Sequence, residues 1–175
     1  MSQLVALSLS IAVLGAIWAF FALGPLSGFV LVWAGFIAWG CFFHTGGDIK
    51  ALQKTIVGTV YGAVVAWIAL LIIVNVPIAA LGAIWPAIIV GVTVFCLVIV
   101  ASVDLLSAVP ANVYGYAALV GYSLHQPSAL QNLGAPSFAN PLILLVVSLV
   151  IGALLGYLSG LLTKMLTTSK TPAAA

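Results

Sequence analysis

The sequence contains no arginine and no glutamate, and only 3% of its 175 residues are charged. A soluble domain carries about 25% charged residues. Without arginine there is no voltage-sensing helix, and four lysines against two aspartates are too few for a nucleic-acid-binding surface. The remaining composition is 65% hydrophobic. A chain of this length cannot hide so much apolar surface in water, so we expect it to lie in a lipid bilayer.

Side chains for chemistry are equally scarce. The chain has two histidines, two aspartates and two cysteines, and they lie in separate segments. Cys41 and Cys96 both fall inside apolar runs, where a cysteine is typically a small buried hydrophobe. We therefore expect no enzyme, disulfide, metal or cofactor, and no ion-coupled transport through charged groups at the bilayer midplane.

The apolar runs predict an all-α membrane protein with six transmembrane helices, because a helix of about 20 apolar residues crosses a bilayer. Proline, glycine and asparagine separate the runs, and Pro110 and Asn112 interrupt the fifth. The second and fifth runs are the weakest, and partly re-entrant segments are the alternative for them. We expect one transmembrane domain over residues 1–166 and a short cytoplasmic tail at 167–175. The six runs are residues 4–23, 28–43, 49–74, 84–103, 105–124 and 141–166.

The lysines support an even number of crossings. With six spans, Lys50, Lys54, Lys164 and Lys170 all fall on the side of the membrane that holds both termini. Because positive residues concentrate in the cytoplasm, we expect both termini to be cytoplasmic, in a multi-pass protein of the bacterial inner membrane.

A displacement of 81 residues suggests an internal repeat. It places Trp33, Gly40 and His44 on Tyr114, Gly121 and His125. Two pseudo-repeats, about 4–74 and 84–166, would each hold three spans, so the second would be inverted relative to the first. Transporters and channels with inverted repeats carry their pathway at the repeat interface. The alternative is that glycine and aromatic residues align by chance.

Small residues four apart mark two faces for close helix packing, Gly58 with Gly62 and Gly152 with Gly156 and Gly160. In lipid, such residues let backbones approach each other. These faces are expected to meet each other or a second copy of the chain, and a homo-oligomer is expected.

The two aligned stripes are candidates for a solute pathway. Helical periodicity puts Trp33, Gly40 and His44 on one face and Tyr114, Gly121 and His125 on another. Asn112 and the carbonyls near Pro110 would add hydrogen-bond partners. The alternative is that the aromatic residues belong to the interfacial belt and that the histidines lie at headgroup level.

The two acids have separate interpretations. An acid in an otherwise uncharged region is a functional candidate by default, which makes Asp104 a candidate for the pathway. The alternative is a solvated or lysine-paired residue at a helix boundary. Asp48 follows Gly46-Gly47 and is expected to cap the third helix, and an anion-binding turn is its alternative.

The segment Phe43-His44-Thr45-Gly46-Gly47, followed by Ala51-Leu52-Gln53-Lys54 and Gly58, resembles the YcdZ-like family of bacterial inner-membrane proteins of unknown function. The resemblance covers most of the chain and implies an integral inner-membrane protein. It brings no established activity. Aquaporins are excluded because the chain lacks their two Asn-Pro-Ala motifs.

We therefore expect a channel or facilitator for a small uncharged or weakly polar solute, such as urea, an amide, ammonia or a weak acid. Its partners would be lipid, this solute and further copies of itself, with no nucleic acid. The alternative is a structural or accessory membrane protein that docks a partner through its glycine-rich faces.

Overall fold

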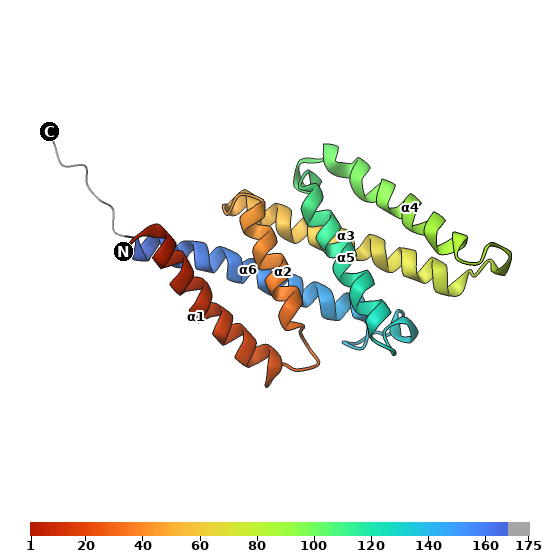
Figure 1. Ribbon diagram of the computed structural model, residues 1–175, viewed down its shortest axis with the longest axis horizontal. Coiled ribbons are helices and arrows are strands. Elements are labelled where there is room, and N and C mark those ends of the chain that lie inside the picture. The colour runs from red at the N-terminus through yellow and green to blue at the C-terminus, as the bar shows by residue number, and fades with distance from the viewer. Residues whose placement is uncertain (168–175) are drawn as a thin grey trace.

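The computed structural model describes residues 1–167, and these residues form six α-helices (Figure 1). Short 3-10 turns lie at 79–81, 100–102, 104–106 and 130–132. Apart from Thr167, the expected tail lies outside the described residues. The helices are α1 (Gln3–Leu23), α2 (Val32–His44), α3 (Ile49–Asn75), α4 (Ile84–Ile99), α5 (Val109–His125) and α6 (Pro141–Leu166).

Local chemistry explains where three of the helices begin. The Ser2 hydroxyl accepts a hydrogen bond from the Val5 amide at the start of α1. Asp48 accepts one from the Ala51 amide at 2.7 Å, which confirms the expected cap of α3. Gly46 and Gly47, with φ of 125° and 70°, make the sharp turn before it. Asn140 caps α6, and Pro141 fills its first position, where no amide hydrogen is needed.

The prediction of an all-α fold is confirmed, and the apolar helices suggest a membrane protein. Four are long and apolar enough to cross a bilayer: α1, α3, α6, and α4 together with the turn after it. α2 has 13 residues and α5 has 17. At 1.5 Å per residue these two extend about 20 and 26 Å, which is less than a hydrocarbon core of about 30 Å.

Three predicted boundaries differ from the structure by four residues: the fourth helix ends at Ile99 rather than residue 103, and two helices begin late. The fifth helix begins at Val109 rather than residue 105, and Pro110 lies in its first turn instead of interrupting it. Proline is tolerated there because its ring presets a helical φ. The second helix begins at Val32 rather than residue 28, because Gly28 adopts a φ of 87° and Leu31, directly before the helix, has an extended backbone.

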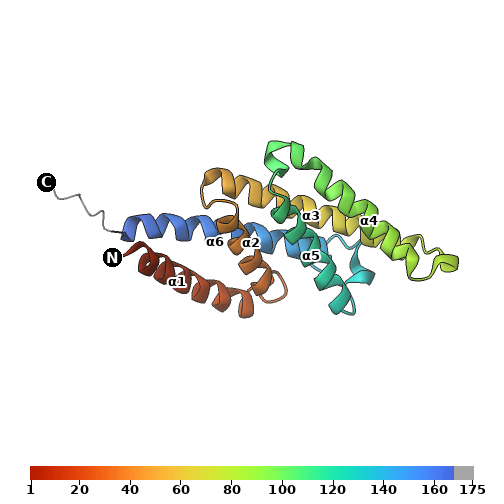
Figure 2. The same cartoon turned by 45° about the horizontal axis from the view of Figure 1, so that its top comes forward.

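The long helices α3 and α6 pack against each other at the centre of the molecule, and each carries a short helix from the other half of the chain (Figures 1 and 2). α5 packs along α3, and α2 packs along α6. At the periphery, α4 lies beside α3 and α1 lies beside α6. The hydrophobic core therefore forms between α2, α3, α5 and α6.

Glycines allow the two closest helix pairs to form. A methyl group added to Gly62 on α3 would overlap the carbonyl oxygen of Asn112 on α5. One added to Gly152 on α6 would overlap the carbonyl oxygen of Gly35 on α2. Gly58 and Gly156 approach the same partner helices, and Gly160 lies looser, with its nearest contact to Phe42 at 3.9 Å. The two glycine faces therefore contact short helices of this chain and do not meet each other.

Hydrogen bonds fix α2 against its neighbours. The indole Nε1–H of Trp39 donates to the Ser159 hydroxyl at 3.0 Å, and the Leu31 amide donates to the Ser148 hydroxyl at 2.8 Å. The Trp18 indole on α1 donates to the Val32 carbonyl at 2.9 Å. These three hydrogen bonds tie α2 and the residue before it to α1 and α6.

Candidate functional site

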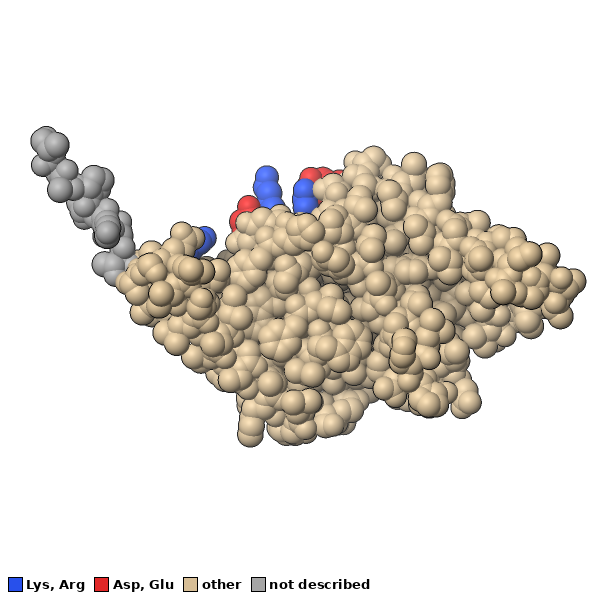
Figure 3. Space-filling view, viewed as in Figure 1, with Lys and Arg blue, Asp and Glu red and all other residues tan. Residues whose placement is uncertain are grey.

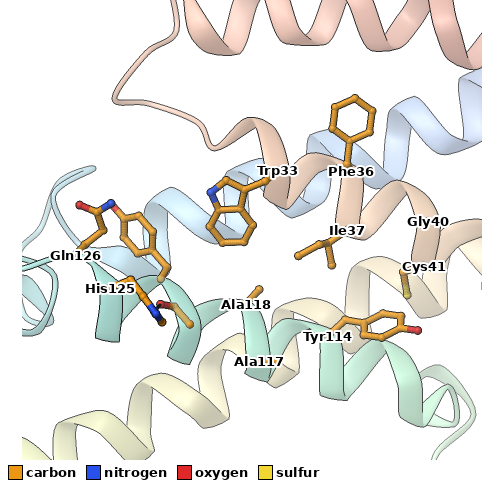
Figure 4. A pocket seen from close by; sticks show the side chains of 12 residues that line it. Trp33, Phe36, Ile37, Gly40, Cys41, Tyr114, Ala117, Ala118, His125 and Gln126 are labelled. Carbon is orange, nitrogen blue, oxygen red and sulfur yellow. Dashed lines mark hydrogen bonds between the residues drawn. The ribbon is translucent and has the colours of Figure 1, made fainter.

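A groove of about 750 Å³ lies between α2 and α5 (Figure 4). Figure 4 shows Trp33 and Ile37 reaching into it from one helix and Tyr114, Ala118 and His125 from the other. Most of the two predicted stripes thus line a single space, which we call the α2–α5 groove. Its lining residues are Trp33, Phe36, Ile37, Gly40, Cys41, Tyr114, Ala117, Ala118, Gly121, Tyr122, His125 and Gln126.

The groove exists because small residues face each other across it. A methyl group added to Gly40 or Gly121 would meet no atom within 4 Å. Ala117 and Ala118 add little bulk. Two of its aromatic residues are well exposed, Trp33 at 38% and Phe36 at 43%. The groove is therefore open along one side of the molecule.

The lining is largely apolar and includes no charged side chain. Its middle is formed by residues such as Ile37 and Ala118, while Tyr114 lies toward one end and His125 with Gln126 toward the other (Figure 4). Cys41 adds a buried thiol beside Thr45. Such a space suits a ligand with an apolar body, and it offers hydrogen bonds mainly at its ends.

At one end of the groove, a hydrogen bond joins the two helices. His44 Nδ1 lies 2.9 Å from the Tyr114 hydroxyl, and their rings are 6.0 Å apart. Beyond this pair is a second cavity of about 290 Å³, lined by His44, Thr45, Lys54, Ser107, Ala108 and Pro110. His44 thus belongs to the polar cavity, and its partner Tyr114 belongs to the groove.

The charged side chains visible in Figure 3 gather along one edge of the molecule, which we call the charged edge. Lys54 Nζ lies 3.0 Å from the Asp104 carboxylate and also donates to the Ser107 hydroxyl at 3.0 Å. The side chain of Asp104 is 84% exposed and lines neither cavity. Its position matches the lysine-paired boundary residue that was the alternative to a role in the pathway.

The structure does not place Asn112 in the groove, contrary to the prediction. Asn112 is fully buried, and its amide donates to the carbonyls of Leu97 and Leu106 at 3.3 and 3.0 Å. Asn112 precedes Tyr114 by two residues, and two residues turn a helix by about 200°. Its side chain therefore faces α3 and the end of α4, where it ties down the backbone after α4.

Sequence reasoning missed several residues of the groove, chiefly Phe36, Cys41 and Tyr122. Phe36 lies one turn after Trp33, and Tyr122 follows Gly121 directly. The Trp33 and Tyr122 rings lie 6.4 Å apart across the groove. A stripe widened to include both i+3 and i+4 neighbours would have found Phe36.

Within residues 1–167, no three His, Cys, Asp or Glu side chains are grouped to hold a metal ion. The lining of the α2–α5 groove consists mainly of aromatic, small and hydrogen-bonding side chains. This arrangement can hold an uncharged molecule between two helices and contact it at either end.

Residues 8–164 match the model of a family described as protein of unknown function, DUF1097, and the chain belongs to that family. No curated protein and no solved structure matches the chain.

Proposed function

We propose that this DUF1097 protein is a membrane facilitator that moves a small uncharged or weakly polar solute along the α2–α5 groove. The observation that carries the proposal is the groove itself, an uncharged space between two helices that are too short to fill the bilayer. A protein with a purely structural role has no need for opposed glycines that leave such a space open.

The proposal includes six crossings of the membrane. The segments flanking α2, 24–31 and 45–48, would complete its crossing, and the 3-10 turns at 100–106 would lead into that of α5. The chain then alternates in direction from α1 to α6. The N-terminal ammonium of Met1 donates to the carbonyl of Leu166 at 3.4 Å. This contact is expected if the first span starts and the last span ends on the same side of the membrane.

The pattern of helix contacts supports two inverted three-helix units. The pairing of α2 with α6 corresponds to that of α5 with α3, and α1 beside α6 corresponds to α4 beside α3. Exchanging the first three helices with the last three leaves the set of contacts unchanged. An inverted repeat places a pseudo-twofold axis in the membrane plane and a pathway at the repeat interface, which is where the groove lies.

The charged edge would face the cytoplasm of a bacterial inner membrane. Lys54 lies there, Lys50 precedes it by one turn of α3, and Lys164 lines a small cavity together with Asp48. Positive residues retained on one side of a multi-pass protein favour this orientation. The 290 Å³ cavity is then the cytoplasmic mouth, and His125 lies near the outer mouth.

The groove favours an uncharged solute. No charged side chain lines it to offset the desolvation of an ion. Hydrogen bonds come from Tyr114, His125 and Gln126, so selectivity would depend on width and on these ends. Small amides, ammonia and protonated weak acids are uncharged and can form hydrogen bonds with these end residues.

The test is solute permeation into proteoliposomes, measured by stopped-flow light scattering or an internal pH dye, with urea, acetamide, glycerol, ammonia and acetate. Gly40→Leu and Gly121→Leu fill the groove without meeting any atom within 4 Å of the first added carbon. Gly91→Leu is the matched control, because Gly91 on α4 also has open space around it and lies away from the groove.

We expect faster permeation of at least one solute, lost in both groove variants and retained in Gly91→Leu. Rates equal to those of empty liposomes for every solute would refute the proposal. Equal rates in the groove variants and the control would remove the groove as the pathway.

A further inference from the structure

We infer that the two ends of the α2–α5 groove open alternately, and that this structure holds the groove closed at the charged edge. The protein would then work as a carrier with two states rather than as a continuous pore. The inference rests on the proposed pathway and its inverted repeat.

The closed end is the His44–Tyr114 pair. The bond joins the last residue of α2 to the first half of α5, at 2.9 Å. Tyr114 lines the groove on one side of the bond, and His44 lines the polar cavity on the other. The pair therefore joins the two helices at the boundary between the two spaces, and we infer that a solute passing from one to the other separates these two side chains.

The opposite end carries the corresponding residues in a different state. Under the 81-residue displacement, His44 corresponds to His125, and Tyr114 corresponds to Trp33. Trp33 and His125 line the groove from opposite helices, yet no hydrogen bond joins them (Figure 4). His125 Nδ1 instead lies 2.8 Å from the Gly121 carbonyl of its own helix, and the Trp33 ring lies against Tyr122.

Two equivalent pairs in two different states imply a second conformation of the whole protein. If the two units exchange conformations, the Trp33 indole donates to the His125 ring, and His44 turns back to the carbonyl of Gly40. Gly40 is the equivalent of Gly121, the residue that His125 contacts now. Each conformation has one bond across the groove and one histidine bonded within its own helix, so the exchange conserves the number of hydrogen bonds.

The groove has room for this movement. Neither Gly40 nor Gly121 has a neighbour within 4 Å of an added methyl group, so α2 and α5 are not in backbone contact at these turns. The interfaces between α2 and α6 and between α5 and α3 are tight at glycines. We therefore expect each short helix to move together with the long helix of the other unit, as rigid-body rocking of one pair against the other.

Thiol labelling tests the state of each end. Gly40→Cys and Gly121→Cys place a reporter one helical turn inside each end, in a background of Cys41→Ala and Cys96→Ala. A membrane-impermeant methanethiosulfonate reagent is added to either side of oriented vesicles. In this conformation, Gly121→Cys should react with reagent added on the side opposite the charged edge. Gly40→Cys should be protected from reagent added on the side of the charged edge.

Loss of the His44–Tyr114 hydrogen bond should expose the cysteine of Gly40→Cys to the reagent. Tyr114→Phe should raise the reaction rate of Gly40→Cys from the charged edge by about 10-fold, the effect expected for one hydrogen bond. His44→Gln provides a second variant of the same contact. Tyr61→Phe is the control, because it removes a hydroxyl that bonds the Cys96 carbonyl at 2.9 Å on the far side of α3. If the labelling rate of Gly40→Cys is unchanged in both Tyr114→Phe and His44→Gln, the inference is overturned.

Cross-linking tests whether the second conformation exists. A bridging reagent should join the pair His44→Cys with Tyr114→Cys rapidly. It should join Trp33→Cys with His125→Cys more slowly but completely, and either cross-link should stop permeation. Failure of the second pair to cross-link, while both thiols still react with a small reagent, would show a fixed groove.

The outcomes separate this inference from the proposed function. Labelling and cross-linking that follow the expectation, without permeation of any test solute, would support alternation of the groove and refute the proposed facilitator function. Facilitated permeation that persists through the His44–Tyr114 cross-link would support the groove as a passive path and overturn alternation.

Discussion

Gly62→Ala should weaken the protein through a single added methyl group. The methyl would overlap the Asn112 carbonyl oxygen and lie 2.8 Å from the Tyr116 amide nitrogen. Both atoms belong to the backbone of α5, so no side-chain rotation relieves the overlap. α3 and α5 must therefore move apart at this interface.

The expected magnitude follows from two opposing effects. Overpacking of a tight interface costs about 3 kcal/mol at the upper end of the usual range. Alanine in place of glycine within a helix returns about 1 kcal/mol through backbone entropy. The net loss is therefore about 2 kcal/mol, close to a 30-fold change in the folded-to-unfolded ratio.

The measurement is reversible unfolding in mixed micelles of dodecyl maltoside and sodium dodecyl sulfate, followed by circular dichroism. Gly91→Ala is the control, because its methyl meets nothing within 4 Å and keeps the helix-propensity gain. If Gly62→Ala unfolds at the same detergent fraction as Gly91→Ala, the close approach of α3 and α5 is refuted.

Three further changes test other contacts. Asn112→Leu removes the hydrogen bonds to the carbonyls of Leu97 and Leu106, so thermal unfolding in detergent should show a loss of about 1–3 kcal/mol, with solute permeation unchanged. Trp39→Phe removes the bond to the Ser159 hydroxyl and part of a side chain that is 2% exposed, so it should cost more than about 1 kcal/mol. Trp85→Phe should cost less in the same assay, because the buried Trp85 Nε1 has no hydrogen-bond partner among residues 1–167. Asp104→Asn breaks an exposed ion pair, and a stability loss above about 1 kcal/mol would contradict its surface position.

Periodicity and composition were enough to locate the helices. The runs predicted at 49–74 and 141–166 match α3 and α6 to within a residue at each end, because Asp48, Asn75 and Pro141 bound them with clear chemistry. The start of α5 was missed because Pro110 looks the same in a sequence whether it breaks a helix or begins one. Only the backbone before it, in 3-10 turns, distinguishes the two cases.

The site was predictable where it depends on helical phase and not where it depends on partners. Trp33 and Tyr114 share a groove because each stripe keeps one face of its helix. The glycine faces were correctly seen as small-residue surfaces, but their partners are set by tertiary packing, which no spacing reveals. Asp104 drew attention by its charge alone, whereas its position depends on Lys54, fifty residues earlier in the chain.

The exchange of short helices between the two halves also bears on how the chain is made. α2 emerges second from the ribosome, but its main partner α6 emerges last, and the contact between Trp39 and Ser159 spans 120 residues. A nascent chain that ends before Pro141 leaves the buried face of α2 without its partner. Insertion of the helices must therefore precede their assembly, and neither half of the protein is a self-sufficient folding unit. Synthesis of the final helix is the step that completes both halves at once.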